Sequence, residues 1–157
     1  MIPKFISSTK KQLVLFDMDG VVAEFVAGEE IEIREGTYGA YANKRPIMSI
    51  IDVAKKLDEM PNVTVGILSS CNFQSQVQEK KEWLKKYMPF LKDENIMIIV
   101  WKQTDYTKEN KCYAKLDAIK KIDGYDDIFL IEDTHKNITA TNEYMPSIAH
   151  HLTELLD

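Results

Sequence analysis

Two aspartates separated by one residue, Asp17 and Asp19, come directly after a short apolar run and directly before Gly20. The apolar run, residues 13–16, has the length and character of a buried strand in a parallel sheet. Two carboxylates beside a glycine that permits a tight turn suit a hard cation, because Mg2+ binds oxygen ligands. Asp and Gly are also ordinary turn residues. The pattern alone therefore leaves a magnesium site and a structural turn as equal alternatives.

Polar residues also follow two later apolar runs. Ser69 comes after residues 63–68, and Glu132 and Asp133 come after residues 128–131. If the first strand lies between these two, all the polar groups converge at one edge of a parallel sheet. Four carboxylates in one crevice repel one another unless a cation neutralises them, so Mg2+ is the expected occupant. A metal and carboxylate cluster beside a hydroxyl and a lysine suits phosphoryl transfer.

Strand-like and helix-like segments alternate along the whole chain. The apolar runs predict strands at residues 13–16, 63–68, 96–101, 128–131 and 147–149. Apolar residues at spacings of three and four predict helices at residues 45–60, 74–88 and 112–122, with a shorter helical stretch before the last strand and a helical turn at 152–156. This alternation predicts an α/β fold with a doubly wound, mainly parallel, five-stranded Rossmann-like sheet.

Residues 24–44 interrupt the alternation after the first strand. They contain three glycines, and apolar and charged residues alternate within residues 30–35. Alternation bounded by glycines predicts a small β-hairpin. The segment is long enough for a flap over the site and too short for a second domain, so residues 1–157 are expected to form one domain.

The composition is that of an ordinary globular protein. Hydrophobic residues make up 45% and charged residues 29% of the 157 residues. The formal net charge of −5 is unfavourable for a general nucleic-acid or anionic-membrane surface. Two cysteines are too few for a disulfide framework, and no segment has the character of a signal peptide or a membrane-spanning helix. A cytoplasmic protein without a membrane partner is expected.

Three short motifs occur in order, each at the end of a predicted strand. They are Phe-Asp-Met-Asp-Gly-Val at residues 16–21, Ile-Leu-Ser at 67–69 and Leu-Ile-Glu-Asp at 130–133. These motifs resemble the first, second and fourth motifs of the haloacid dehalogenase superfamily of phosphatases. The resemblance extends over residues 13–137 and implies a Mg2+-dependent phosphatase that acts through an aspartyl-phosphate.

The resemblance implies a role for each polar residue. Asp17 would be the nucleophile, and Asp19 would protonate the leaving oxygen and later activate water. Asp19 needs a proton for the first of these steps, and neighbouring carboxylates are expected to raise its pKa. Ser69 would bind the transferring phosphoryl group, or Ser70 if the strand ends one residue later.

The same resemblance implies the charged partners of the phosphoryl group. The Mg2+ ligands would be the Asp17 carboxylate, the Asp19 backbone carbonyl and Asp133, with Glu132 binding through water. A lysine would neutralise the nucleophile and the phosphate. Lys115 is the first choice, because it lies in the helix before the fourth strand. Lys80 is the second, because deoxyribonucleotidase-like members take their lysine from the helix after the second strand.

Two further resemblances concern the substrate. Residues 79–88 are similar to deoxyribonucleotidases, and residues 101–108 with Lys115 are similar to the phosphatase half of polynucleotide kinase-phosphatases. The acidic net charge favours a nucleotide monophosphate, hydrolysed by a 5'-nucleotidase-like enzyme, over a nucleic-acid end processed by a 3'-phosphatase. A non-catalytic domain that binds a phosphorylated ligand or a protein is an alternative from another class. A small flap leaves the crevice open, which implies a bulky substrate or closure by a second subunit in a homo-oligomer.

Overall fold

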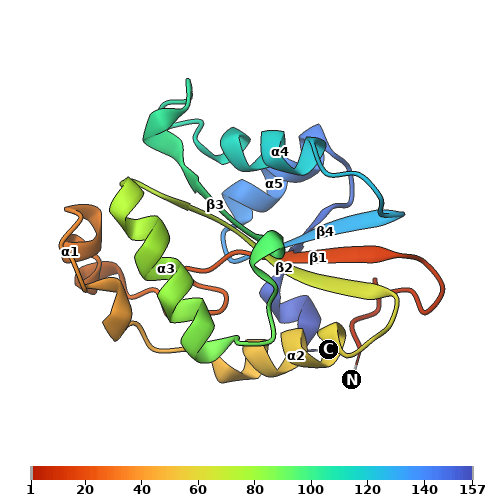
Figure 1. The fold of residues 1–157 in the computed structure, drawn as a ribbon. Coiled ribbons are helices and arrows are strands. Elements are labelled where there is room, and N and C mark those ends of the chain that lie inside the picture. The colour runs from red at the N-terminus through yellow and green to blue at the C-terminus, as the bar shows by residue number, and fades with distance from the viewer. Residues whose placement is uncertain (1, 157) are drawn as a thin grey trace.

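The structure, a computed structural model, describes residues 2–156, within which five parallel strands form one sheet. The strands are β1 (Gln12–Phe16), β2 (Val63–Cys71), β3 (Ile96–Val100), β4 (Asp127–Glu132) and β5 (Ala149–His151). Their order in the sheet is β3-β2-β1-β4-β5, so β1 lies between β2 and β4 (Figure 1). This order confirms the Rossmann-like doubly wound sheet and the central position expected for the first strand.

Helices cover both faces of the sheet, as expected for crossovers of one hand. They are α1 (Ile31–Arg34), α2 (Met48–Asp58), α3 (Gln74–Tyr87), α4 (Cys112–Lys120) and α5 (His135–Tyr144). Val14 and Phe16 belong to a core cluster with α2 and α3, whereas Leu13 and Leu15 pack with α4 on the opposite face. In Figure 1, α4 and α5 lie on one side of the sheet and α2 on the other. Both faces of β1 are therefore buried, which explains its unbroken apolar sequence.

The helix α2 shows how spacing in the sequence positions a helix on the sheet. Ile50, Ile51, Ala54 and Leu57 recur at spacings of one, three and three residues, and none is more than 3% exposed. This stripe faces the sheet, and Asp52, Lys55 and Lys56 between its members are exposed. Fully burying one such aliphatic side chain contributes about 1.5–3 kcal/mol to folding.

Residues 24–44 do not form the predicted β-hairpin. The segment contains two 3-10 helices, η1 (Ala27–Glu29) and η2 (Tyr41–Asn43), on either side of α1. Of the two isoleucines in the alternating stretch, Ile31 is 57% exposed and Ile33 is partly buried against the core, so the alternation does not define a buried strand face. The backbone carbonyl of Ile33 instead accepts a hydrogen bond from Gln76 Nε2 at 2.6 Å. An isolated two-stranded hairpin is marginal in water, whereas this segment makes hydrogen bonds with Gln76 and Glu79 of α3.

The last predicted elements are confirmed with small shifts. The fifth strand covers Ala149–His151, and a 3-10 turn, η5 (Leu152–Leu155), follows it. Across residues 2–156 the structure contains no helix long and apolar enough to cross a membrane.

Candidate active site

The polar residues that follow the strands meet at the carboxyl ends of β1, β2 and β4. They surround a cleft of about 320 Å3. Its lining includes Asp17, Asp19, Ser70, Lys80, Lys115 and Asp133. Ser69 and Glu132 lie beneath this lining, each 1% exposed. All the residues singled out in the sequence are therefore brought to one place.

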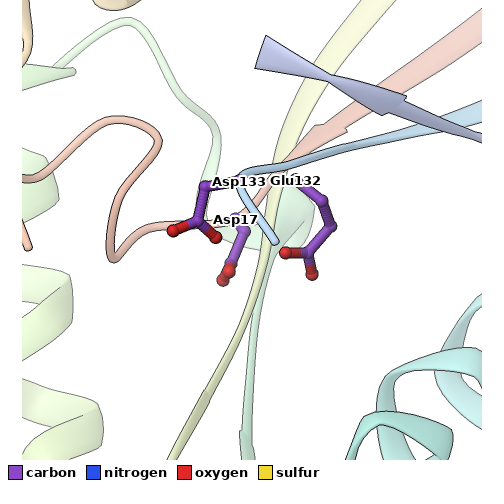
Figure 2. Close-up of side chains that lie close together, drawn as sticks. All are labelled: Asp17, Glu132 and Asp133. Carbon is purple, nitrogen blue, oxygen red and sulfur yellow. The ribbon is translucent and has the colours of Figure 1, made fainter. Parts of the chain in front are cut away.

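Three carboxylates form the centre of the site. One oxygen from each of Asp17, Glu132 and Asp133 lies within 4.8 Å of the other two. Figure 2 shows the three side chains extending into the same region from the ends of their strands. Glu132 Oε1 accepts a hydrogen bond from Lys115 Nζ at 2.9 Å, but the buried Oε2 has no partner within residues 2–156. An unsatisfied buried oxygen costs about 1–3 kcal/mol, so this cluster fits a cation with oxygen ligands such as Mg2+.

Burial and mutual repulsion govern the charges of this cluster. Burial raises the pKa of Asp17 to about 6, although Lys115 Nζ, 3.0 Å from Asp17 Oδ1, acts in the opposite direction. Burial and the charge of Asp17 also raise the pKa of Asp133. Burial alone would lower the pKa of Lys115, but Asp17 and Glu132 outweigh it and raise that pKa. One lysine thus opposes three carboxylates, and a divalent cation would neutralise the remainder.

The Asp133→Asn substitution tests this cation site without any assay of activity. In EDTA we expect the variant to melt about 2–4 °C above the wild type. Removing one of the like charges lowers the electrostatic repulsion in the cluster, which should stabilise the fold by about 1 kcal/mol. Adding Mg2+ should raise the melting temperature of the wild type much more than that of the variant. Thermal unfolding with and without Mg2+ measures both effects, with Asp52→Asn on the exposed side of α2 as control. An equal Mg2+ response in Asp133→Asn and the wild type would place the cation elsewhere.

Gly20 is the turn residue that brings the chain close to Asp133. Its φ is +80°, and a Cβ at this position would lie 2.0 Å from Asp133 Oδ2. The Gly20→Ala variant should therefore lose at least about 1–2 kcal/mol of stability from backbone strain alone. It should also bind Mg2+ roughly tenfold more weakly, because Asp133 must move. Calorimetric Mg2+ titration measures the second effect. Gly28→Ala is the control, because a Cβ there meets nothing within 4 Å. Equal Mg2+ affinity in the two variants would contradict the prediction.

Asp19 belongs to a second cluster, formed with residues of the insert and α3. Its Oδ1 accepts hydrogen bonds from Tyr41 Oη at 2.9 Å and Lys44 Nζ at 2.7 Å, and Lys80 Nζ lies 3.2 Å from Oδ2. Lys44 also pairs with the buried Glu30 at 2.9 Å. Burial alone would raise the pKa of Asp19, but Lys80 and Lys44 outweigh it and hold that pKa well below its usual range. The expected rise from neighbouring carboxylates is therefore wrong for this structure.

Three residues of this cluster, two of which contact Asp19 directly, were not predicted from the sequence. Glu30, Tyr41 and Lys44 come from the insert, and each is at most 8% exposed. Outside residues 30–35 the insert shows no periodic pattern of apolar residues, and the alternation within 30–35 predicted a hairpin. No sequence signal marked these residues as neighbours of Asp19.

Both candidate lysines reach the site, and they serve different carboxylates. Lys115 contacts Asp17, whereas Lys80 contacts Asp19 and donates hydrogen bonds to Ser69 Oγ and the Ser70 carbonyl, each at 2.8 Å. The strand β2 continues past residue 68 to Cys71, so Ser69 is buried inside it. Ser70, named as the alternative for a longer strand, is the serine that lines the cleft.

Comparisons with known proteins support the fold. No family model matches the chain. No curated protein matches it either. Among solved structures, a chain of the Pnkp1/Rnl/Hen1 complex is similar, with a TM-score of 0.66 at 15% identity over 92% of this chain and 47% of that chain. The present chain thus spans about half the length of that neighbour. At this identity the similarity shows a shared fold, and the chemistry has to be argued from the residues of the cleft.

Proposed function

We propose that this protein is a Mg2+-dependent phosphomonoesterase in which Asp17 forms an aspartyl-phosphate. The arrangement around Asp17 is the observation that carries the proposal. Its Oδ1 accepts a hydrogen bond from the Met18 amide at 2.8 Å and lies 3.0 Å from Lys115 Nζ. Oδ2 has no hydrogen bond to any residue from 2 to 156, and Asp17 lines the cleft. One oxygen is held and the other is free to attack, as a nucleophilic carboxylate requires.

The reaction proceeds in two displacements at phosphorus. Asp17 Oδ2 attacks phosphorus while the bond to the leaving oxygen breaks, and the leaving oxygen takes a proton from Asp19. Water then attacks phosphorus and transfers a proton to Asp19, and the bond to Asp17 breaks. Both aspartates return to their starting states and inorganic phosphate is released.

Asp19 must first take a proton from solvent. In the free protein Lys44 and Lys80 favour its ionised form. A phosphate dianion entering the cleft is a like charge that raises the pKa of Asp19 and also competes for Lys80. Tyr41 and Lys44 keep the carboxyl in place during this change.

Several groups of the cleft are available to the phosphoryl oxygens. The Lys80 ammonium and Ser70 line the cleft next to Asp19, and Lys115 lies beside Asp17. Mg2+, held by Asp17, Glu132 and Asp133, would neutralise charge on the phosphoryl group. The resemblance to haloacid dehalogenase phosphatases also implies Asp17 and Asp133 as ligands, with the Asp19 backbone carbonyl as a third and Glu132 binding through water.

A nucleoside monophosphate is the first substrate class that we propose, on the resemblance of residues 79–88 to deoxyribonucleotidases. A polynucleotide 3'-end is the second candidate. The fold that this chain shares with a chain of the Pnkp1/Rnl/Hen1 complex supports this candidate. The resemblance of residues 101–108 supports the same candidate.

Phosphate release tests the proposed activity. The assay compares p-nitrophenyl phosphate, nucleoside 5'- and 3'-monophosphates and a 3'-phosphorylated oligonucleotide, each with Mg2+ and with EDTA. Release that requires Mg2+ supports the phosphomonoesterase, and the preferred member of the panel separates nucleotidase from end-processing enzyme. Absence of release from every member would contradict the proposal and favour a domain that binds a phosphorylated ligand.

A further inference from the structure

Two positively charged side chains of the cleft have no role in the mechanism above. Arg34, at the end of α1, and Lys111, just before α4, both line the cleft that contains Asp17. Lys80 and Lys115 in the same cleft are paired with carboxylates. In the part of the chain that the structure describes, neither Arg34 nor Lys111 has a carboxylate within 4.0 Å. Within residues 2–156, they are therefore charges of the cleft without a carboxylate counter-ion.

Lys111 stands closer to the mouth of the cleft than the lysine beside the nucleophile. Lys115 is 5% exposed and its Nζ lies 3.0 Å from Asp17 Oδ1. Lys111 precedes it by four residues, is partly exposed and lies where α4 begins. One helical turn advances about 5.4 Å, so the two lysines stand one above the other along the cleft wall. A group bound by Lys111 would be separated from the reacting phosphorus by about the width of a sugar.

Lys111 is partly buried and has positively charged neighbours. Its ammonium lies 5.4 Å from the centroid of the Trp101 ring. Burial lowers the pKa of Lys111, and the charges that lower it further belong to Lys108, Lys115, Lys80 and Arg34. The insert and α4 thus bring like charges together at one end of the cleft. This repulsion is relieved when an anion binds between them.

We propose that Lys111 and Arg34 bind a second phosphate group of the substrate, while the first is hydrolysed at Asp17. The preferred substrate is then a nucleotide with two phosphates separated by one sugar. A nucleoside 3',5'-bisphosphate and the terminal nucleotide of a strand share this chemistry. The inference rests on the proposed phosphomonoesterase function, and it explains how an acidic chain accepts a polyanionic substrate through a local basic site.

Binding to an inactive variant tests the second site without turnover. Asp17→Asn would be titrated calorimetrically with thymidine 5'-monophosphate and with thymidine 3',5'-bisphosphate in the presence of Mg2+. We expect the bisphosphate to bind at least about tenfold more tightly, since hydrogen bonds to charged groups are worth about 1.5–3 kcal/mol. Adding Lys111→Gln and Arg34→Gln should remove this preference and leave affinity for the monophosphate within about threefold. Lys121→Gln, at the exposed far end of α4, is the control and should change neither affinity.

The outcomes separate the second site from the proposed activity. Equal affinity for the two nucleotides, or a preference that survives both substitutions, would overturn the second phosphate site even if the native protein releases phosphate. Absence of release from the native protein would overturn the activity, while the binding preference in Asp17→Asn would still decide the site. A thymidine dinucleotide with one terminal phosphate distinguishes the two kinds of ligand, a free bisphosphate and the terminal nucleotide of a strand. A gain equal to that of the bisphosphate shows that one neighbouring phosphate of a strand suffices, and no gain identifies a free bisphosphate as the ligand.

Discussion

Replacing Asp17 by Asn should reduce phosphate release by roughly a thousandfold or more, with the fold intact. The amide oxygen can still accept the hydrogen bonds that Met18 and Lys115 make to Oδ1. The amide nitrogen that replaces Oδ2 cannot attack phosphorus, so no aspartyl-phosphate forms. Initial rates at saturating Mg2+ measure the loss. The mass of acid-quenched protein during turnover should show one added phosphoryl group in the wild type and none in the variant.

Asp52→Asn is the matched control for this prediction. Asp52 is an exposed carboxylate of α2 that does not line the cleft, so its variant should retain the rate of the wild type. Undiminished turnover in Asp17→Asn would rule out covalent catalysis by this residue. A phosphorylated Asp17→Asn protein would assign the nucleophile to another side chain.

Replacing Lys115 by Met should have the second largest effect, on stability and rate together. Lys115 Nζ lies 3.0 Å from Asp17 Oδ1 and 2.9 Å from Glu132 Oε1. Without it, no cation in residues 2–156 lies within 4.0 Å of either carboxylate. Breaking a buried ion pair by removing one partner costs about 3–5 kcal/mol, and Met retains most of the lysine volume. We expect destabilisation of this order in EDTA, part of which Mg2+ restores.

Lys80→Met is the comparison, because the removed lysine has a different partner. Asp19 keeps its contacts with Lys44 and Tyr41 when Lys80 is removed. The loss of stability should therefore be smaller than for Lys115→Met. We expect the rate of phosphate release to fall roughly hundredfold in Lys115→Met and by much less in Lys80→Met. Urea unfolding in EDTA and in Mg2+, together with phosphate release, measures both variants. Equal and small effects would remove both lysines from their assigned roles.

The sequence predicted the sheet well because its signals are local. The run at residues 13–16 has no polar residue, which requires cover on both faces, and β1 has that cover. Charged residues end two of the apolar runs: Asp17 follows β1 directly, Glu132 is the last residue of β4, and Asp133 comes next. The positions of Asp17, Glu132 and Asp133 at strand ends were therefore predictable. The parallel order of the strands brings one carboxylate oxygen of each within 4.8 Å of the others.

The insert shows where such signals fail. Ile31 and Ile33 are two residues apart, and this spacing occurs in a strand and within one turn of helix alike. In the structure, a side chain 43 residues further along, Gln76, donates a hydrogen bond to the Ile33 carbonyl, and no local pattern encodes that contact. The end of β2 was also misplaced, because Ser69 and Ser70 are polar and still belong to the strand. A buried serine in a strand needs a partner, and Ser69 has Lys80.

By itself, the sequence determined the alternation of strands and helices and the placement of carboxylates and serines at one edge of the sheet. Period and chain order are sufficient for both. Only the tertiary structure decided which cation faces which carboxylate. Asp17 is paired with Lys115, whereas Asp19 is held by Lys44 and Lys80, which are 25 and 61 residues away. Electrostatic energies at about 3 Å depend on side-chain positions, which elements far apart in the chain determine. The lowered pKa of Asp19 could therefore be inferred only from the folded insert and α3.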